Sequence, residues 1–84
     1  MNNSESRVKK YVPVLVMFEE SGRMTPLEIY WEDGRRFLID RVLDMRPAVS
    51  RKAGGQGIRY LCRIKNQEVL LFYEEPKWFV EEKK

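Results

Sequence analysis

Residues 27–44 read LEIYWEDGRRFLIDRVLD and show the clearest structural pattern in the chain. Apolar and polar residues alternate on both sides of Asp33-Gly34, which is typical of two β-strands joined by a tight turn. A two-residue loop would place apolar residues opposite charged ones. A three-residue loop over 32–34 instead pairs Ile29 with Phe37 and keeps the large apolar residues, Leu27 included, on one face. We therefore expect a type I turn with Gly34 in the left-handed conformation.

The alternation changes after this hairpin, because Ile39 and Val42 are both apolar yet three residues apart. A β-bulge at Asp40-Arg41 would return Val42 to the core and bend the strand, and bent strands are how small sheets close on themselves. A single helical turn over 40–46 is the alternative.

The same period-two pattern predicts four further strands, over 11–18, 58–64, 69–73 and 78–80. A two-residue turn at Asn66-Gln67 keeps the apolar faces of the second and third of these together. It places Leu61 opposite Phe72, Arg63 opposite Leu70 and Arg59 opposite Glu74. Residues 46–57, RPAVSRKAGGQG, have no apolar period, so we expect a mobile loop there.

Six short strands, tight turns and one bend indicate an all-β fold, and we expect a small SH3-like barrel. An OB-like barrel is the alternative. The 84 residues suffice for one domain. We expect residues 1–10 to be a disordered tail, 11–80 the single β-barrel domain and 81–84 a polar tail.

Composition excludes several kinds of function. The chain has no histidine, and Cys62 is its single cysteine, so neither histidine-based catalysis nor an intrachain disulfide is possible. We expect Cys62 to be buried, and we expect no catalytic residues, no metal site and no cofactor. No apolar run is long enough to span a membrane and no signal peptide is visible, so we expect a cytoplasmic, non-enzymatic protein.

The net charge of +3 is unevenly distributed. Residues 35–65 hold nine basic and two acidic side chains, which leaves seven basic and eleven acidic side chains in the rest of the chain. This asymmetry is typical of proteins that bind a polyanion, or of an ordinary solvated surface.

Two partner classes follow from these residues. Single-stranded nucleic acid would be bound by basic side chains, and the expected set is Arg36, Arg46, Arg51, Lys52, Arg59 and Arg63. A larger protein would dock on an apolar patch formed by Leu61, Leu70 and Phe72, or on an open strand edge, and a second copy of the chain would use the same patch.

Several short motifs carry a resemblance. They are W-x-x-G-R from Trp31, then Phe37, Ile39 and Val42-Leu43, then R-Y-x-x-R-I over 59–64, L-F-Y over 71–73, and Trp78-Phe79. In these motifs, residues 26–80 resemble a family of small all-β bacterial domains of unknown function that occur beside Y-family DNA-repair polymerases. The family's further tryptophan after V-L is replaced here by Met45-Arg46. The resemblance implies an accessory role near DNA repair, with a DNA-repair polymerase as a partner.

Overall fold

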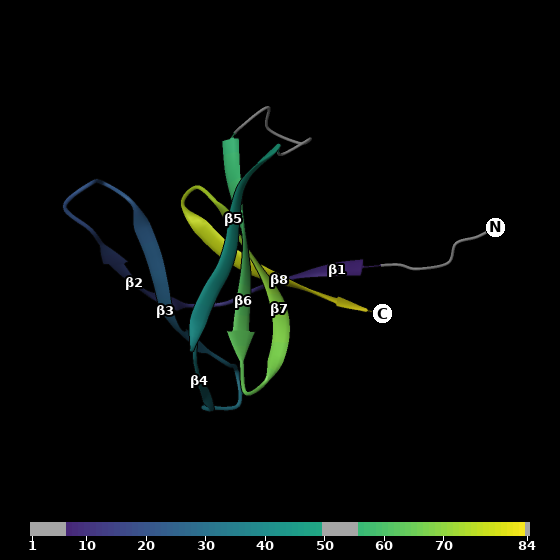
Figure 1. Ribbon diagram of the computed structural model, residues 1–84. Coiled ribbons are helices and arrows are strands. Elements are labelled where there is room, and N and C mark those ends of the chain that lie inside the picture. Colours follow the sequence, from purple (N-terminus) through teal and green to yellow (C-terminus); the bar gives the residue numbers. More distant parts are fainter. Residues whose placement is uncertain (1–6, 50–55, 84) are drawn as a thin grey trace.

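The computed structural model describes residues 7–49 and 56–83, which form eight β-strands and no helix (Figure 1). The strands are β1 (Arg7–Tyr11), β2 (Val14–Phe18), β3 (Met24–Tyr30), β4 (Arg36–Leu38), β5 (Arg41–Val49), β6 (Gln56–Ile64), β7 (Gln67–Glu74) and β8 (Lys77–Lys83). One antiparallel sheet has the order β1-β8-β7-β6-β5, and a second has the order β2-β3-β4. The all-β class is therefore confirmed, with eight strands in place of the expected six. No helix in the described part of the chain could cross a membrane.

The two sheets pack against one core. Tyr60, Cys62, Leu71 and Trp78 enter it from the five-stranded sheet, and Ile29 enters it from the three-stranded sheet. The Tyr60 hydroxyl donates a 2.8 Å hydrogen bond to the Met24 carbonyl and so ties the sheets together. In the described ranges no ladder joins one sheet to the other, so the sheets are not closed into a barrel.

The hairpin between β3 and β4 has the expected register. Ile29 lies opposite Phe37, and Gly34 donates its N–H to the Trp31 carbonyl with a φ of +92°. The expected faces are only partly correct, because Leu27 is exposed and Glu28 is buried. The reason lies in the neighbouring strand, where a register shift between Leu15 and Val16 interrupts the ladder opposite Leu27.

The strand expected over 11–18 is only partly correct: Val14–Phe18 is a strand, but the chain leaves one sheet for the other at Val12-Pro13. The Val12 N–H bonds to the Trp78 carbonyl of β8, and the Pro13 carbonyl accepts a bond from Tyr30 of β3. Phe18, the last residue of β2, is 72% exposed because the hairpin from β2 to β3 extends past the five-stranded sheet (Figure 1).

The expected tails are shorter than predicted. Strand β1 begins at Arg7 and pairs with β8, which continues to Lys83. The first and last described strands therefore lie side by side, and this pairing adds a strand to each end of the chain.

The link after the central hairpin also differs from the prediction. No bulge lies at Asp40-Arg41, and no helical turn occurs; residues 39–40 connect β4 to β5, and the register shift lies between Val42 and Asp44. Val42 does pack against the core as expected. The change of direction is thus made by crossing between sheets rather than by bending one strand.

The expected register between β6 and β7 is wrong by two residues. Leu61 lies opposite Leu70, Arg59 opposite Phe72 and Arg63 opposite Glu68. The turn residues are Lys65 and Asn66, with φ of 49° and 64°, as a type I′ turn requires. A shift of two leaves every side chain on the same face, so the alternation pattern could not distinguish the two registers.

The long loop expected over 46–57 is wrong at both of its ends, where the described residues are strand. Strand β5 continues to Val49 and β6 starts at Gln56. Pro47 lies in β5, which is an edge strand and so tolerates a residue without an N–H donor. Arg51 and Lys52 lie outside the described residues.

Candidate binding face of the five-stranded sheet

We call the side of the five-stranded sheet that points away from the core its outer face. Five residues occupy directly opposed positions on its five adjacent strands and form what we call the central row. The row runs from β5 to β1 as Arg46, Arg59, Phe72, Phe79 and Tyr11. Because side chains alternate along a strand, all five belong to one face of the sheet. Its two arginines form what we call the cationic half of the row, and its three aromatic residues form the aromatic half.

The aromatic half is packed as a ladder. The rings of Phe72 and Phe79 stack at 4.9 Å with an interplanar angle of 7°, and Tyr11 meets Phe79 edge-on at 5.7 Å. The Lys9 ammonium lies 4.8 Å from the centre of the Phe79 ring, which leaves Phe79 only 5% exposed. Tyr11 is 48% exposed. The ladder therefore presents Tyr11 and part of Phe72 to an incoming planar group.

The cationic half is one of two like-charged cross-strand pairs on this face. Arg46 lies opposite Arg59, and Arg41 lies opposite Arg63, on the same ladder between β5 and β6. Opposed like charges destabilise a sheet by roughly 0.2–1 kcal/mol. The side chains of Arg59 and Arg63 make no hydrogen bond or ion pair with another described residue. This arrangement leaves guanidinium groups available for an external anion.

An apolar strip lies between the two arginine pairs. Leu61 and Leu70 face each other across the β6–β7 ladder, and Asp44 lies opposite Leu61 on β5. Leu70 is exposed and Leu61 is half-buried. Asp44 bonds the Arg46 guanidinium at 2.8 Å, as expected from the sequence. The middle of this face therefore brings arginine, leucine and aromatic rings together, with the Asp44 carboxylate beside Arg46.

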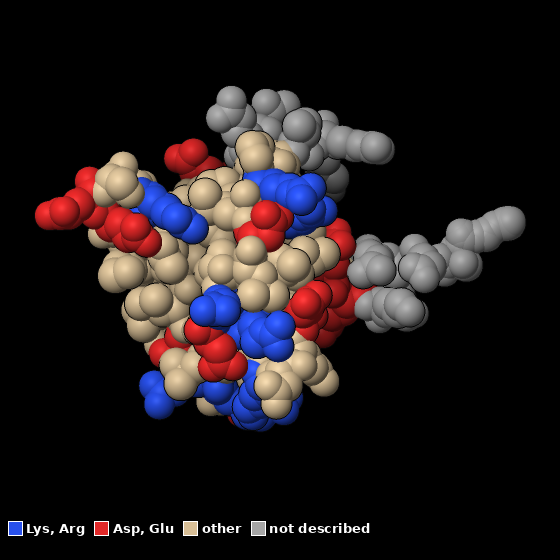
Figure 2. All heavy atoms as spheres, in the orientation of Figure 1, with Lys and Arg blue, Asp and Glu red and all other residues tan. Residues whose placement is uncertain are grey.

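Acidic side chains limit the positive potential of the surface. Glu68 and Glu74 belong to the outer face at the β7 positions opposite Arg63 and Gly57. Glu74 pairs with Lys9 at 3.3 Å. On the side of the molecule seen in Figure 2, Lys and Arg lie in several separate groups, with Asp and Glu beside most of them. A bound polyanion would thus contact separate basic side chains rather than one continuous basic patch.

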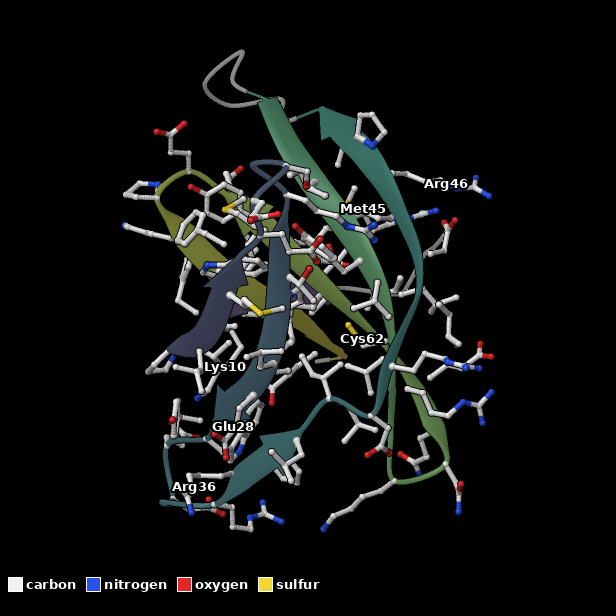
Figure 3. The ribbon with its side chains drawn as sticks, turned by 60° about the vertical axis from the view of Figure 1, so that its left-hand side comes forward. Lys10, Glu28, Arg36, Met45, Arg46 and Cys62 are labelled. Carbon is white, nitrogen blue, oxygen red and sulfur yellow. The ribbon has the colours of Figure 1, made fainter. Side chains whose placement is uncertain are left out.

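The structure brings only some of the predicted site residues together. Arg46, Arg59 and Arg63 share the outer face with all three predicted partner-binding residues, Leu61, Leu70 and Phe72. Arg36 is separate, because it lies on β4 of the other sheet, 3.6 Å from the buried Glu28 carboxylate. Figure 3 shows Arg36 beside Glu28, while Arg46 projects outward from β5.

Sequence reasoning missed Tyr11, Phe79, Lys9, Lys77 and Arg41. The Lys77 ammonium lies 5.3 Å from the centre of the Tyr11 ring, so it joins the same face. Tyr11 and Phe79 meet only because the two ends of the chain pair, and no local pattern encodes that pairing. The one available signal was that Phe79 alternates with Trp78 and Val80, which both point into the core.

The described residues give no support to catalytic chemistry. Cys62 is fully buried, and burial raises the pKa of its thiol to about 11, so it is not a thiolate at neutral pH. No group of three or more Cys, Asp or Glu side chains in the described ranges could hold a metal ion.

A hollow of about 360 Å³ opens between the sheets, beside the turns of the β3–β4 and β6–β7 hairpins. Apolar side chains, including Trp31 and Phe37, line its floor. Lys65 and Arg35 both approach the Phe37 ring, at 5.5 and 5.3 Å, and Glu81 and Glu82 complete the lining. Its opposed charges favour neither anions nor cations, so it defines no ligand class.

Among protein-family models, curated proteins and solved structures, none matches this chain. Its function is therefore inferred from its own surface, and the outer face holds the largest group of predicted site residues.

Proposed function

We propose that the chain is a non-enzymatic module that binds single-stranded nucleic acid on the outer face of its five-stranded sheet. The observation that carries the proposal is the central row, where two opposed arginines continue into three contacting aromatic rings. Single strands are bound by this combination, because bases stack on aromatic rings while arginine contacts phosphate. The opposed pair Arg41–Arg63 supplies two further phosphate contacts, four residues along β6 from Arg59.

The position of the second pair sets the path of the strand. Arg59 and Arg63 are four residues apart on β6, which corresponds to about 13 Å along a β-strand. The Leu61–Leu70 strip lies between them and offers an apolar surface to a base or sugar. A bound strand would therefore run along β6, with phosphates at both arginine pairs and a base directed toward Phe72 and Tyr11.

The test is a fluorescence-anisotropy titration of the full chain with a short labelled single-stranded DNA over a range of salt concentrations. Contact with four phosphates gives a slope of log K against log salt of about −2.8, and loss of two contacts gives about −1.4. We expect the double variant Arg59→Ala, Arg63→Ala to show the smaller slope. The control, Arg36→Gln, removes the same kind of charge from the other sheet and should keep the larger slope. Equal losses in both variants, or no binding at low salt, would refute the proposal.

A second candidate is docking on a larger protein through Leu61, Leu70 and Phe72. Two observations favour it: Leu61 and Leu70 are directly opposed, and Leu70 is 38% exposed on the outer face. The resemblance to domains beside Y-family polymerases would make such a polymerase the partner. Calorimetric titration with a polymerase of that family tests it, with Leu70→Asp as the disrupting variant. Binding by this route would tolerate salt, unlike contact with phosphate.

The SH3-like barrel belongs to the same proposal as a finer description of the fold. Its support is the chain from β1 to β2, which pairs with β8 before Pro13 and with β3 after it, as a strand shared by two sheets does in a small barrel. Hydrogen bonds measured by NMR between the sheets would establish closure, and their absence would leave an open two-sheet fold.

A further inference from the structure

The edges of the two sheets differ in how they are protected against pairing with another strand. Natural proteins shield edges with charges, proline, bulges or short strands. Strand β1 carries Lys9 and Lys10, and β4 is only three residues long and carries Arg36. Strand β5 carries Pro47, arginines and a register shift.

Strand β2 carries no charge and no proline, and the register shift in its ladder places the extra residue, Leu27, on β3 rather than on β2. Its sequence is VLVMF, with no charge, proline or glycine, and within the described residues it pairs with β3 alone. It also holds the most exposed aromatic ring of the molecule, because Phe18 is 72% exposed, and Leu15 and Met17 are nearly half exposed. Among the edges of the two described sheets, β2 is therefore the one suited to receive another strand.

The backbone shows which side of β2 is open. Val12 directs its N–H toward Trp78 of β8, whereas Pro13 directs its carbonyl toward Tyr30 of β3. Because successive residues of a strand direct their polar groups to opposite sides, Val14 directs its N–H and C=O to the side away from β3. On that side the start of β2 diverges from the turn that precedes β8.

A hollow lies at this divergence. Its volume is about 400 Å³, and its lining joins both sides: Tyr11, Val12, Pro13, Val14, Pro76, Lys77 and Trp78. The floor is apolar, and the one charged group in the lining is the Lys77 ammonium. The start of β2 thus offers an apolar recess with a cation at its rim.

We propose that β2 pairs antiparallel with β2 of a second copy, about a two-fold axis at Val16. In this register Val14 lies opposite Phe18 of the second copy, and Leu15 lies opposite its Met17. Like faces meet, and no charges are opposed within the paired strands. The two-fold symmetry makes the interface closed, so association stops at the dimer.

The hollow and the turn after β2 explain why the occupant is a second copy. Phe18 of the second copy arrives beside Val14, where the apolar recess lies, and loses the exposure that it has in the single chain. The next residues, Glu19 and Glu20, reach the rim that holds Lys77, so acidic and basic groups meet. The dimer joins the two three-stranded sheets into one, and of the outer face of the five-stranded sheet its recess includes Tyr11 and Lys77.

The test is sedimentation of the full chain over a concentration series that reaches the millimolar range, without nucleic acid. We expect the mass to rise from one chain to two and no further. Phe18→Glu places a charge in the recess and should weaken dimerisation by about 100-fold or more, as loss of a buried aromatic anchor does. The matched control is Leu38→Glu, which introduces the same charge at a residue 66% exposed on β4 of the same sheet. It should dimerise as the parent chain does.

Amide hydrogen exchange supplies a second readout that does not depend on a variant. The Val14 N–H should become protected as concentration rises, because it gains a partner only in the dimer. Sedimentation would overturn the proposal if it showed a single chain at every concentration, growth beyond two chains, or equal weakening by both variants. Hydrogen exchange would overturn it if exchange of the Val14 amide did not depend on concentration.

Discussion

Arg46 and Arg59 lie directly opposite each other across the β5–β6 ladder, on the outer face of the five-stranded sheet. Asp44 bonds the Arg46 guanidinium, whereas that of Arg59 has no hydrogen bond or ion pair with another described residue. Opposed like charges carry a stability cost. We interpret the opposed arginines as a surface that binds an anion at the expense of stability. A substitution that removes one of these charges should therefore raise stability and weaken binding.

Arg59→Glu should raise stability and abolish nucleic-acid binding. The change replaces an opposed like-charged pair with an opposite-charged one, which is worth about 0.5–1 kcal/mol in the free energy of unfolding. Urea unfolding measures the stability and the anisotropy titration measures the binding. A variant that is less stable than the parent, or that binds the DNA equally well, would contradict this interpretation of the pair.

The buried thiol predicts how stability depends on pH. Burial raises the pKa of Cys62 from 9.0 to about 11. The unfolded thiol thus loses its proton at lower pH than the folded thiol, so stability is full below pH 9 and falls as the pH rises toward 11. Two pKa units correspond to about 2.7 kcal/mol. Unfolding by urea across this range measures the loss.

Cys62→Ala is the control for this pH dependence. The variant should be less stable at neutral pH, by about 1–3 kcal/mol, because a buried side chain is shortened. Its stability should nevertheless fall less steeply between pH 9 and 11 than that of the parent chain. Parallel pH curves for the two proteins would show that the thiol is not the group responsible.

Gly57 and Gly34 should respond differently to alanine. A Cβ at Gly57 would lie 2.8 Å from the Tyr73 carbonyl oxygen and 3.3 Å from that of Ala48, so both neighbouring strands would have to move. A Cβ at Gly34 meets nothing within 4 Å, and the cost there is that of a φ of +92°.

We therefore expect Gly57→Ala to lower the free energy of unfolding by about 2–4 kcal/mol and Gly34→Ala by about 1–2 kcal/mol. Thermal unfolding of both variants checks the order. If Gly34→Ala were the more damaging change, the close packing of β5, β6 and β7 around Gly57 would be wrong.

Substitutions of Arg36 test whether this arginine serves stability rather than nucleic-acid binding. Its guanidinium lies 3.6 Å from the Glu28 carboxylate, which is buried beside the Tyr30 hydroxyl. Arg36→Ala should destabilise the protein by about 1–2 kcal/mol, because the carboxylate loses a partner in a buried position. Arg36→Gln keeps a donor and should recover part of the loss, and neither variant should change nucleic-acid affinity.

Local chemistry predicted the elements that depend on neighbouring residues. Asp33-Gly34 placed the central hairpin in its correct register because one face is buried and a slip by one residue would expose it. The turn at Lys65-Asn66 was expected one residue later, which shifts the pairing register by two; such a shift preserves both faces, and the positive φ values at Lys65 and Asn66 mark the observed turn. Arg59 was consequently expected opposite Glu74 and is found opposite Phe72.

Features that depend on contacts between distant segments could not be predicted. Strand β1 exists because it pairs with β8, which joins Tyr11 to Phe79. The first ten residues have no periodicity from which pairing with β8 could be predicted. The same pairing completes the aromatic half of the central row, so the sequence predicted three of the four arginines and both leucines of the candidate site but only one of its three rings.

The most direct test of the binding face is an amide-shift NMR titration of the ¹⁵N-labelled chain with a short single-stranded DNA, first at low and then at physiological salt. We predict shifts that cluster at Arg46, Arg59, Arg63 and Phe72, with Arg36 unaffected, and that fade as salt is added. Spectra that do not change at low salt, or shifts confined to the three-stranded sheet, would contradict nucleic-acid binding by the outer face.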